Sequence, residues 1–356
     1  VVMITYPLDN NVLTEEQALL NMRYYLQKQL SEGPAMTYPI FLLVSGKVLT
    51  EGCSSQSYLH KSVIPYIRGP FSQFLEQNND DVENNGGTHP AFPFLTAHGG
   101  FVQAVVQGLL GLRFGYRAST HIERVLFLDP VALPILGNDL YVKGVKYLNQ
   151  TLDFVVSQDG LIVKHTGTLE GAEPVTVIIE TFARGPDDST HFLHPNSEVI
   201  IESYTPMKSI PLSSCECEEA IIYNITAGIH GDVLSLINDG DNMTHWQAES
   251  AEQPARFLVD LKKFKRIKGG SINWGNRPAK SYKVYANAAR SASLKTLRLK
   301  DFEKVVQEDN KISEPFSWQD YTSVHSIDRF NTTEFDNKFR ARFIIFEFEG
   351  VFDDDN

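Results

Sequence analysis

Residues 86–113 read GGTHPAFPFLTAHGGFVQAVVQGLLGLR, and the second half of this stretch decides how the rest of the chain is interpreted. Over residues 100–113, apolar side chains such as Phe101, Val105 and Leu109 fall on every face of a helix. A helix that is apolar all round is buried, so we expect other helices to cover it. The first half is rich in glycine, proline and aromatic residues and predicts a loop.

The sequence upstream of this stretch predicts further helices. Over residues 14–30, apolar residues recur three or four apart, and Thr14 with Gln17 forms a capping-box pattern at the start. Two more helices are predicted over residues 33–49 and 57–67. We expect Pro39 to kink the first of these, because proline lacks the amide that a helix interior needs.

Downstream of residue 113 the pattern changes to short β-branched runs separated by turn residues, which predicts antiparallel strands. The first set of strands is expected at residues 124–128, 139–147, 151–156, 161–164, 175–181 and 199–203. Residues 204–219 contain prolines and serines without a period and predict a linker. A second set, predicted at residues 256–261, 270–274, 281–286 and 341–347, indicates a second β-sandwich.

Charge and hydropathy exclude two classes of function. The 356 residues include 32 Lys and Arg against 44 Asp and Glu, a net charge of −12 with a pI near 5.3. This balance argues against nucleic acid or an anionic membrane as the main partner. We expect no membrane span, because no stretch reaches about 18 uninterrupted apolar residues. Residues 1–8 resemble neither a translation start nor a signal peptide, so the chain reads as one entered midway.

Cysteine use and glycosylation sequons bear on the compartment. Three cysteines are too few for a disulfide framework, and Cys215 and Cys217 are too close to pair comfortably, which leaves the partner of Cys53 open. Four N-x-[S/T] sequons favour the secretory route over a cytosolic chain with accidental matches. The candidate glycosylation sites are Asn149, Asn224, Asn242 and Asn331.

The loop region over residues 68–100 is the strongest candidate for a site, because long loops rich in glycine and aromatics commonly carry function. Glu76 lies there among Phe71, Phe74 and Leu75, and is either an ordinary surface carboxylate or a catalytic acid or base. The loop histidines lack metal-ligand spacing, so we predict no zinc site. No phosphate-binding loop or serine-nucleophile motif accompanies them.

The ordered motifs resemble a known family. Residues 6–8 (YPL), 33–38 (GPAMTY), 68–77 (RGPFSQFLEQ) and 86–113 together are similar to glycoside hydrolase family 65, and within it to the fungal acid trehalases. The resemblance covers about the first 200 residues. It implies the last helices of an (α/α)6 barrel, with the earlier helices and the general acid upstream of residue 1.

The resemblance assigns roles to individual residues. Glu76 occupies the place of the family's general base in an inverting hydrolysis of α,α-trehalose to two glucoses. Residues expected to line the glucose pocket are Thr37, Phe94, Thr96 and His98. Glu32 and Glu51 are weaker rivals for the base. Relatives that are phosphorylases bind phosphate where the base and water would act, and a glutamate there would repel it.

Residues 237–261 and 265–286 carry a second resemblance, to discoidin or coagulation-factor type C β-sandwiches, which often bind sugars. We expect Trp246 to pack in the core and Asp239 and Asp241 to shape a turn, where a structural calcium would also suit the oxygen ligands. No other cofactor is expected. The alternative functions are a carbohydrate-binding or scaffold protein that uses its β-sandwiches, or a related α-glucoside hydrolase or phosphorylase of the same family.

These observations predict a multidomain α + β protein with the end of a helical barrel followed by two antiparallel β-sandwich domains. The predicted boundaries are residues 1–118 for the barrel part, 119–203 for a small β domain, 204–219 for the linker, 220–350 for the discoidin-like sandwich and 351–356 for an acidic tail. The resemblance implies trehalose and the upstream part of the enzyme as partners, and places the protein in the cell wall, periplasmic space, medium or vacuole.

Overall fold

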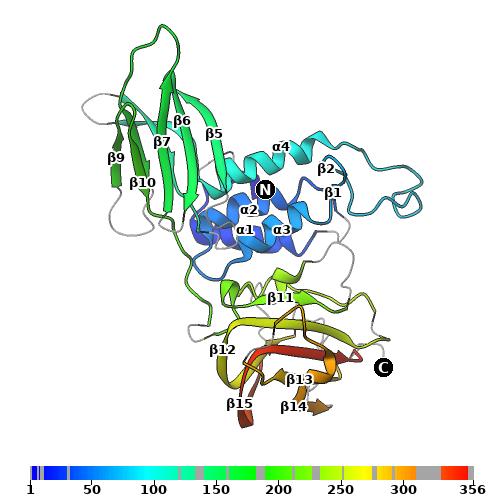
Figure 1. Ribbon diagram of the computed structural model, residues 1–356. Helices are drawn as coiled ribbons and strands as arrows, with labels where there is room; N and C mark the ends of the chain where they lie inside the picture. The colour runs from blue at the N-terminus through cyan, green and yellow to red at the C-terminus, as the bar shows by residue number, and fades with distance from the viewer. Residues whose placement is uncertain are drawn as a thin grey trace.

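The computed structural model describes most of the chain (Figure 1). The residues that it does not describe are 1, 6–7, 9–11, 30–32, 119–121, 133–139, 158–159, 182–188, 211–212, 227–232, 251, 275–278, 291–292, 310–329 and 352–356. Glu32 and nearly all of the predicted acidic tail therefore lie outside the described residues.

A layer of helices forms the middle of the molecule (Figure 1). Its α-helices are α1 (Glu15–Leu26), α2 (Tyr38–Val48), α3 (Ser54–Val63) and α4 (Leu95–Gln103), preceded by a 3-10 turn, η1 (Val2–Ile4). The predicted capping box is confirmed, because Thr14 accepts from the Gln17 amide and Gln17 accepts from the Thr14 amide. Helix α2 packs against α1 and α3, and its Leu42, Leu43 and Val44 are buried in their shared core.

The kink expected at Pro39 is wrong. Pro39 lies in the first turn of α2, where an amide would have no partner within the helix, so proline suits that position. The helix predicted over residues 100–113 is also different in detail. It starts earlier, as α4, and continues as a π-helix, η2 (Ala104–Leu109), with Val102 exposed rather than covered.

The chain leaves the π-helix through a tight turn at Gly111. Its φ of +63° suits glycine, and a Cβ there would lie 2.5 Å from the carbonyl oxygen of Asp129. Strand β3 (Arg113–Ala118) follows directly and pairs with β4 (Ile122–Leu128), so residues 113–118 belong to a sheet.

Two four-stranded sheets then pack face to face. One has the order β3-β4-β8-β9 and the other β10-β7-β6-β5. The remaining strands are β5 (Tyr141–Tyr147), β6 (Gln150–Ser157), β7 (Gly160–Thr168), β8 (Val177–Thr181), β9 (Ser189–Leu193) and β10 (Glu198–Ile201). Leu126, Phe154, Val163 and Ile179 share the buried core between them. The antiparallel prediction fails at one pair, because β4 and β8 run parallel.

A five-stranded antiparallel sheet forms the other end of the molecule, in the order β11-β12-β15-β13-β14. Its strands are β11 (Ile221–Asn224), β12 (Ala255–Asn273), β13 (Ser281–Asn287), β14 (Glu303–Asp309) and β15 (Phe330–Glu349). Phe257, Val259 and Ile344 are buried on one face, and Leu258 and Phe343 on the other. The strands predicted at 256–261 and 270–274 are parts of one long strand, β12.

The structure is thus mostly β-sheet with few helices, in agreement with the broad α + β prediction. The described helices do not by themselves make an (α/α)6 barrel. None of the helices in the described part of the chain is both long and apolar enough to cross a membrane.

Candidate functional site

Glu76 is held where two distant motifs meet. It follows a two-stranded hairpin, β1 (Ile67–Arg68) and β2 (Gln73–Phe74), and its backbone carbonyl accepts from the Ala35 amide at 2.8 Å. Its amide donates to the Ala91 carbonyl at 3.0 Å, and the Ala91 amide donates to Glu76 Oε2, also at 3.0 Å. Three of the motif segments that carry the resemblance, residues 33–38, 68–77 and 86–113, are therefore joined by hydrogen bonds at Glu76.

The carboxylate of Glu76 is half-buried, and a hydrogen bond to one of its two oxygens fixes its position. In the described part of the chain, the Ala91 amide is the donor to Oε2, and Oε1 accepts no hydrogen bond. A fixed carboxylate with one oxygen available is suited to accept a proton from a water molecule.

The aromatic side chains beside Glu76 come from the hairpin and from the start of α4. The Phe94 amide donates to the Phe74 carbonyl at 2.8 Å, which ties the end of the loop to β2. The rings of Phe74 and His98 lie edge to face with centroids 5.0 Å apart, and His98 Nδ1 lies 2.9 Å from the Phe94 carbonyl oxygen. An Nδ1–H that donates to this carbonyl oxygen would hold the ring still.

The predicted pocket residues differ in where they lie. Phe94 and His98 contact the Phe74 cluster, whereas Thr96 is exposed on the first turn of α4. Thr37 is half-buried at the start of α2, and its side chain makes no capping hydrogen bond. The structure thus brings Phe94 and His98 close to the hairpin that precedes Glu76.

Arg68 fixes the hairpin from its other side. Its guanidinium donates to the carbonyl oxygens of Pro65, at 2.8 Å, and Asn78, at 3.0 Å, and pairs with Asp80 at 3.0 Å. These contacts bracket Glu76 from both directions along the chain. Arg68 is therefore a positioning residue for the segment that carries the carboxylate.

The rival Glu51 lies elsewhere. It is exposed at the end of the helical layer and lines a cavity of about 220 Å³ together with Arg23, Ser209 and Asp241. It shares no described element with Glu76.

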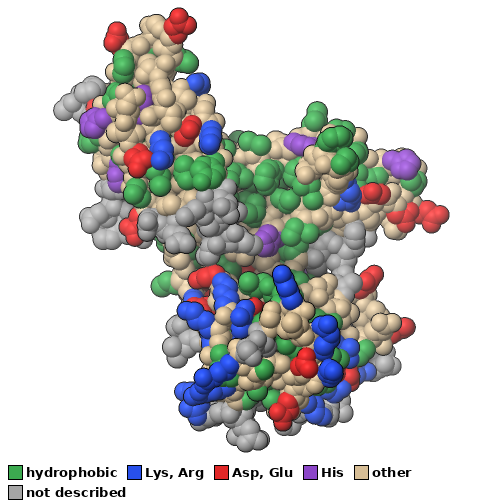
Figure 2. Space-filling view, viewed as in Figure 1, with side chains coloured by type: hydrophobic (Ala, Val, Ile, Leu, Met, Phe, Trp, Pro, Cys, Tyr) green, Lys and Arg blue, Asp and Glu red, His purple; other side chains and the backbone are tan. Residues whose placement is uncertain are grey.

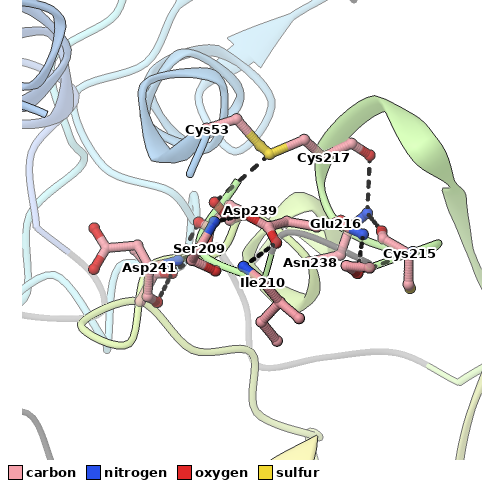
Figure 3. The surroundings of a disulfide bond; sticks show 11 residues. Cys53, Ser209, Ile210, Cys215, Glu216, Cys217, Asn238, Asp239 and Asp241 are labelled. Atoms are coloured by element: carbon pink, nitrogen blue, oxygen red, sulfur yellow. Dashed lines mark hydrogen bonds between the residues drawn. A yellow bond between two sulfur atoms is a disulfide. The ribbon is translucent and has the colours of Figure 1, made fainter. Parts of the chain in front are cut away.

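A second buried cluster joins the helical layer to the C-terminal sheet, and the sequence did not reveal it (Figure 3). Cys53, just before α3, forms a disulfide with Cys217. Beside it, the Cys53 amide donates to the Asp239 carbonyl at 2.6 Å, and Thr244 Oγ1 donates to the Asp239 carboxylate at 2.8 Å. A cysteine pattern of only three residues gave no signal for the pairing.

The pKa of the Asp239 carboxyl group is raised well above its ordinary value. Burial, with a further contribution from the Asp241 carboxylate, raises the pKa of Asp239 to about 8. The same causes, burial first, raise the pKa of Tyr58 on α3 well above its ordinary value. Asp239 is therefore protonated under acidic conditions, as buried carboxyl groups without a cationic partner commonly are.

The aspartate turn itself follows the prediction. The Asp241 amide donates to Asp239 Oδ1 at 3.1 Å, and the Met243 amide donates to Asp241 Oδ1 at 2.9 Å. Trp246 packs edge-on against Phe257. Across the described residues, no group of three or more His, Cys, Asp or Glu side chains is placed to hold a metal ion. The structural calcium stays a prediction.

The sequons lie on the β part of the molecule. Asn149, Asn224 and Asn242 are exposed, in keeping with the access that glycosylation requires. The backbone of Asn331 lies in β15, opposite Ile272, and its side chain is outside the described ones.

Comparisons with known proteins show which enzymes this chain is similar to. No protein-family model matches the chain. Among curated proteins, however, the chain is a homologue of fungal glycosidases, and these are acid trehalases. The cell wall acid trehalase of Candida albicans is 40% identical over 99% of this chain and 35% of its own length. The periplasmic/secreted acid trehalase of Candida glabrata is 38% identical over 79% of this chain and 25% of its own length.

The resemblance to the acid trehalases is therefore confirmed, and the chain spans about a third or less of these relatives. Their names place them in the cell wall, the periplasm or the medium, which agrees with the predicted secretory route. A putative kojibiose phosphorylase from the human microbiome is 16% identical with a TM-score of 0.36, covering 57% of this chain and 24% of that one, which is too distant to bear on fold or function.

Proposed function

We propose that this chain is the part of an acid trehalase that carries the general base, with Glu76 activating the water that attacks α,α-trehalose. The observation that carries the proposal is the half-buried Glu76 carboxylate, with Oε2 fixed by the Ala91 amide and Oε1 left without a donor among described residues. A fixed base with one open oxygen can orient a water and remove its proton as the glycosidic bond breaks.

The proposed reaction inverts one anomeric carbon. A general acid from an upstream segment protonates the glycosidic oxygen, while Glu76 takes a proton from water that attacks the anomeric carbon from the opposite face. The products are one β-glucose and one α-glucose. The acid and base in such enzymes lie about 6.5–9.5 Å apart, which leaves room for the water.

The other predicted features complete this proposal. Helices α1–α4 would be the last helices of an (α/α)6 barrel, followed by two β domains, the first of which begins at β3 and not after residue 118. Phe94, Thr96, His98 and Thr37 would line the glucose site. The protein would act in the cell wall, the periplasm or the medium, as the names of its relatives support.

Proton NMR of the first products tests the proposal. The full-length protein that carries this chain is mixed with α,α-trehalose, and the anomeric signals are recorded before mutarotation. Equal amounts of α- and β-glucose are expected. Pure α-glucose would contradict inversion, and release of glucose 1-phosphate that depends on inorganic phosphate would indicate a phosphorylase instead.

The 356-residue chain alone is expected to release no glucose, because the general acid would be missing. Measurable turnover by this chain in isolation would show that the acid lies within it. No turnover even by the full-length protein would favour a carbohydrate-binding role for the β domains.

A further inference from the structure

The net charge of the chain conceals a strongly basic region. Residues 255–304 contain 14 lysines and arginines and three aspartates and glutamates, which is a net charge of +11 in a chain whose total is −12. Figure 2 shows the blue side chains gathered over the part of the molecule that holds β12, β13 and β15, while they are sparse over the helical layer. The remaining residues together carry −23.

The centre of this region is a pair of like charges on neighbouring strands. Arg266 on β12 and Arg340 on β15 are directly opposite in the antiparallel register, and both side chains are exposed. Like charges in that arrangement repel each other and weaken the sheet. In the described part of the chain, no carboxylate pairs with either guanidinium.

Other cations adjoin the pair along β12. Lys262 and Lys263 are exposed where the register shifts, and Lys268 is exposed two residues after Arg266. The guanidinium of Arg290 lies 5.5 Å from the ring centroid of Phe264, between these lysines and Arg266. We define this set, Lys262, Lys263, Arg266, Lys268, Arg290 and Arg340, as the basic strip.

Other cations on the same two strands have carboxylate partners. Lys265, between the exposed ones, is half-buried and pairs with Glu219 at 3.0 Å, and Arg342 pairs with Asp260 at 2.7 Å. Cations that face the protein thus have carboxylate partners, whereas the basic strip faces solvent. Its charge is available to a partner outside the chain.

The shape of the strip indicates the kind of partner. Residues 262–268 extend over roughly 20 Å of strand, at about 3.3 Å per residue. Neither the cavity beside Asp241 nor the one of about 490 Å³ beside Asp301 is lined by these cations. A row of surface cations that lines neither of these cavities suits a polymer with repeated negative charges and not a small anion.

We propose that the basic strip binds an anionic polysaccharide that carries phosphate or carboxylate groups at intervals along its chain. The choice of a polysaccharide rests on the extracellular placement proposed above. It also fits the charge of the remaining residues, since a net −23 repels a densely charged nucleic acid more than a sparsely charged glycan. Binding holds the enzyme on the polymer and leaves the segment around Glu76, in the helical layer, uncovered.

Binding of the full-length protein to immobilised polysaccharides tests the proposal. The probes are phosphate-bearing mannan, polygalacturonate, neutral mannan and double-stranded DNA. The variant is Arg266→Gln/Arg340→Gln, and the matched control is Lys143→Gln/Lys146→Gln, which removes two exposed cations from β5. Thermal melts and trehalose turnover are measured for each protein.

The wild-type protein and the control are expected to bind both anionic polysaccharides and not neutral mannan, and to lose binding as salt increases. The arginine variant should bind on the order of tenfold more weakly at low salt, with a shallower salt dependence. It should melt no lower than wild type, because a repulsive pair has been removed. Trehalose turnover should be the same in all three, so failure of this proposal is separate from failure of the proposed activity.

Three results would overturn the proposal. The arginine variant could bind as tightly as wild type, or neutral mannan could bind as well as the anionic polymers. Tighter binding of DNA than of either polysaccharide at equal salt would assign the strip to nucleic acid instead.

Discussion

Two places in the molecule hold a carboxylate between segments that are distant in the sequence, and they are built differently. Around Glu76 the segments are joined by backbone hydrogen bonds among residues 35, 76 and 91. The carboxylate stays half-buried, and one of its oxygens accepts no hydrogen bond from the residues that the structure describes. At the junction around Asp239, a disulfide and a fully buried carboxyl group join α3 to the C-terminal sheet. The first arrangement suits chemistry, and the second suits structural stability.

Removal of the disulfide is expected to have the largest effect on stability. Cys53 and Cys217 are 164 residues apart, so the crosslink restricts a long loop in the unfolded chain. Cys53→Ser/Cys217→Ser should lower the free energy of unfolding by about 2–5 kcal/mol, as measured by urea denaturation. Cys215→Ser, which leaves the disulfide in place, is the control. A loss of less than about 1 kcal/mol in the double variant would show that the junction does not depend on the crosslink.

The pH dependence of stability tests the carboxyl group at the same junction. Because the folded pKa of Asp239, about 8, lies above its unfolded value, its contribution to stability is complete below pH about 4. That contribution is lost progressively as pH rises from about 4 to about 8.

Asp239→Asn should flatten this slope when urea denaturation is repeated across the pH range, since asparagine does not ionise. Asp153→Asn is the matched control, because Asp153 lies at a partly exposed site and, among the described residues, accepts from the Gly144 amide alone. An unchanged slope in Asp239→Asn would mean that another group causes the pH dependence.

Substitution of Arg68 tests which contacts hold the segment around Glu76. Arg68→Met removes the donors to the Pro65 and Asn78 carbonyl oxygens, and should cost about 1–2 kcal/mol of stability. Trehalose turnover by the full-length protein should fall several-fold as the hairpin loosens. Asp80→Asn should change neither by much, because the Asp80 side chain is largely exposed and surface ion pairs contribute little. Equal effects of the two variants would show that the ion pair, and not the carbonyl contacts, holds the hairpin.

The sequence predicted local features better than distant ones. The capping box at Thr14 and most strands of the first two sheets could be predicted, because their signals lie within a few residues. The π-helix after α4 and the parallel pairing of β4 with β8 could not, since each depends on packing between segments far apart. Strand β3 was missed because the apolar run before it masks the change of period at Arg113.

The two carboxylates show the same contrast. Glu76 could be singled out because aromatic residues and ordered motifs surround it in the sequence. Asp239 resembled an ordinary turn residue, and its burial follows from contacts with Cys53 and Thr244 that no local pattern encodes. The net charge of the whole chain likewise concealed the basic strip, because the acidic residues lie elsewhere along the chain.

The central claim is that Glu76 is the general base of trehalose hydrolysis, and the turnover of Glu76→Gln in the full-length protein tests it most directly. Glutamine keeps the size of the side chain and can still accept from the Ala91 amide, but it cannot take a proton from water. The turnover number should fall about 10²-fold or more, while the melting temperature and the turnover of the control Glu51→Gln stay near wild type. A fall of less than about tenfold in Glu76→Gln would contradict the claim.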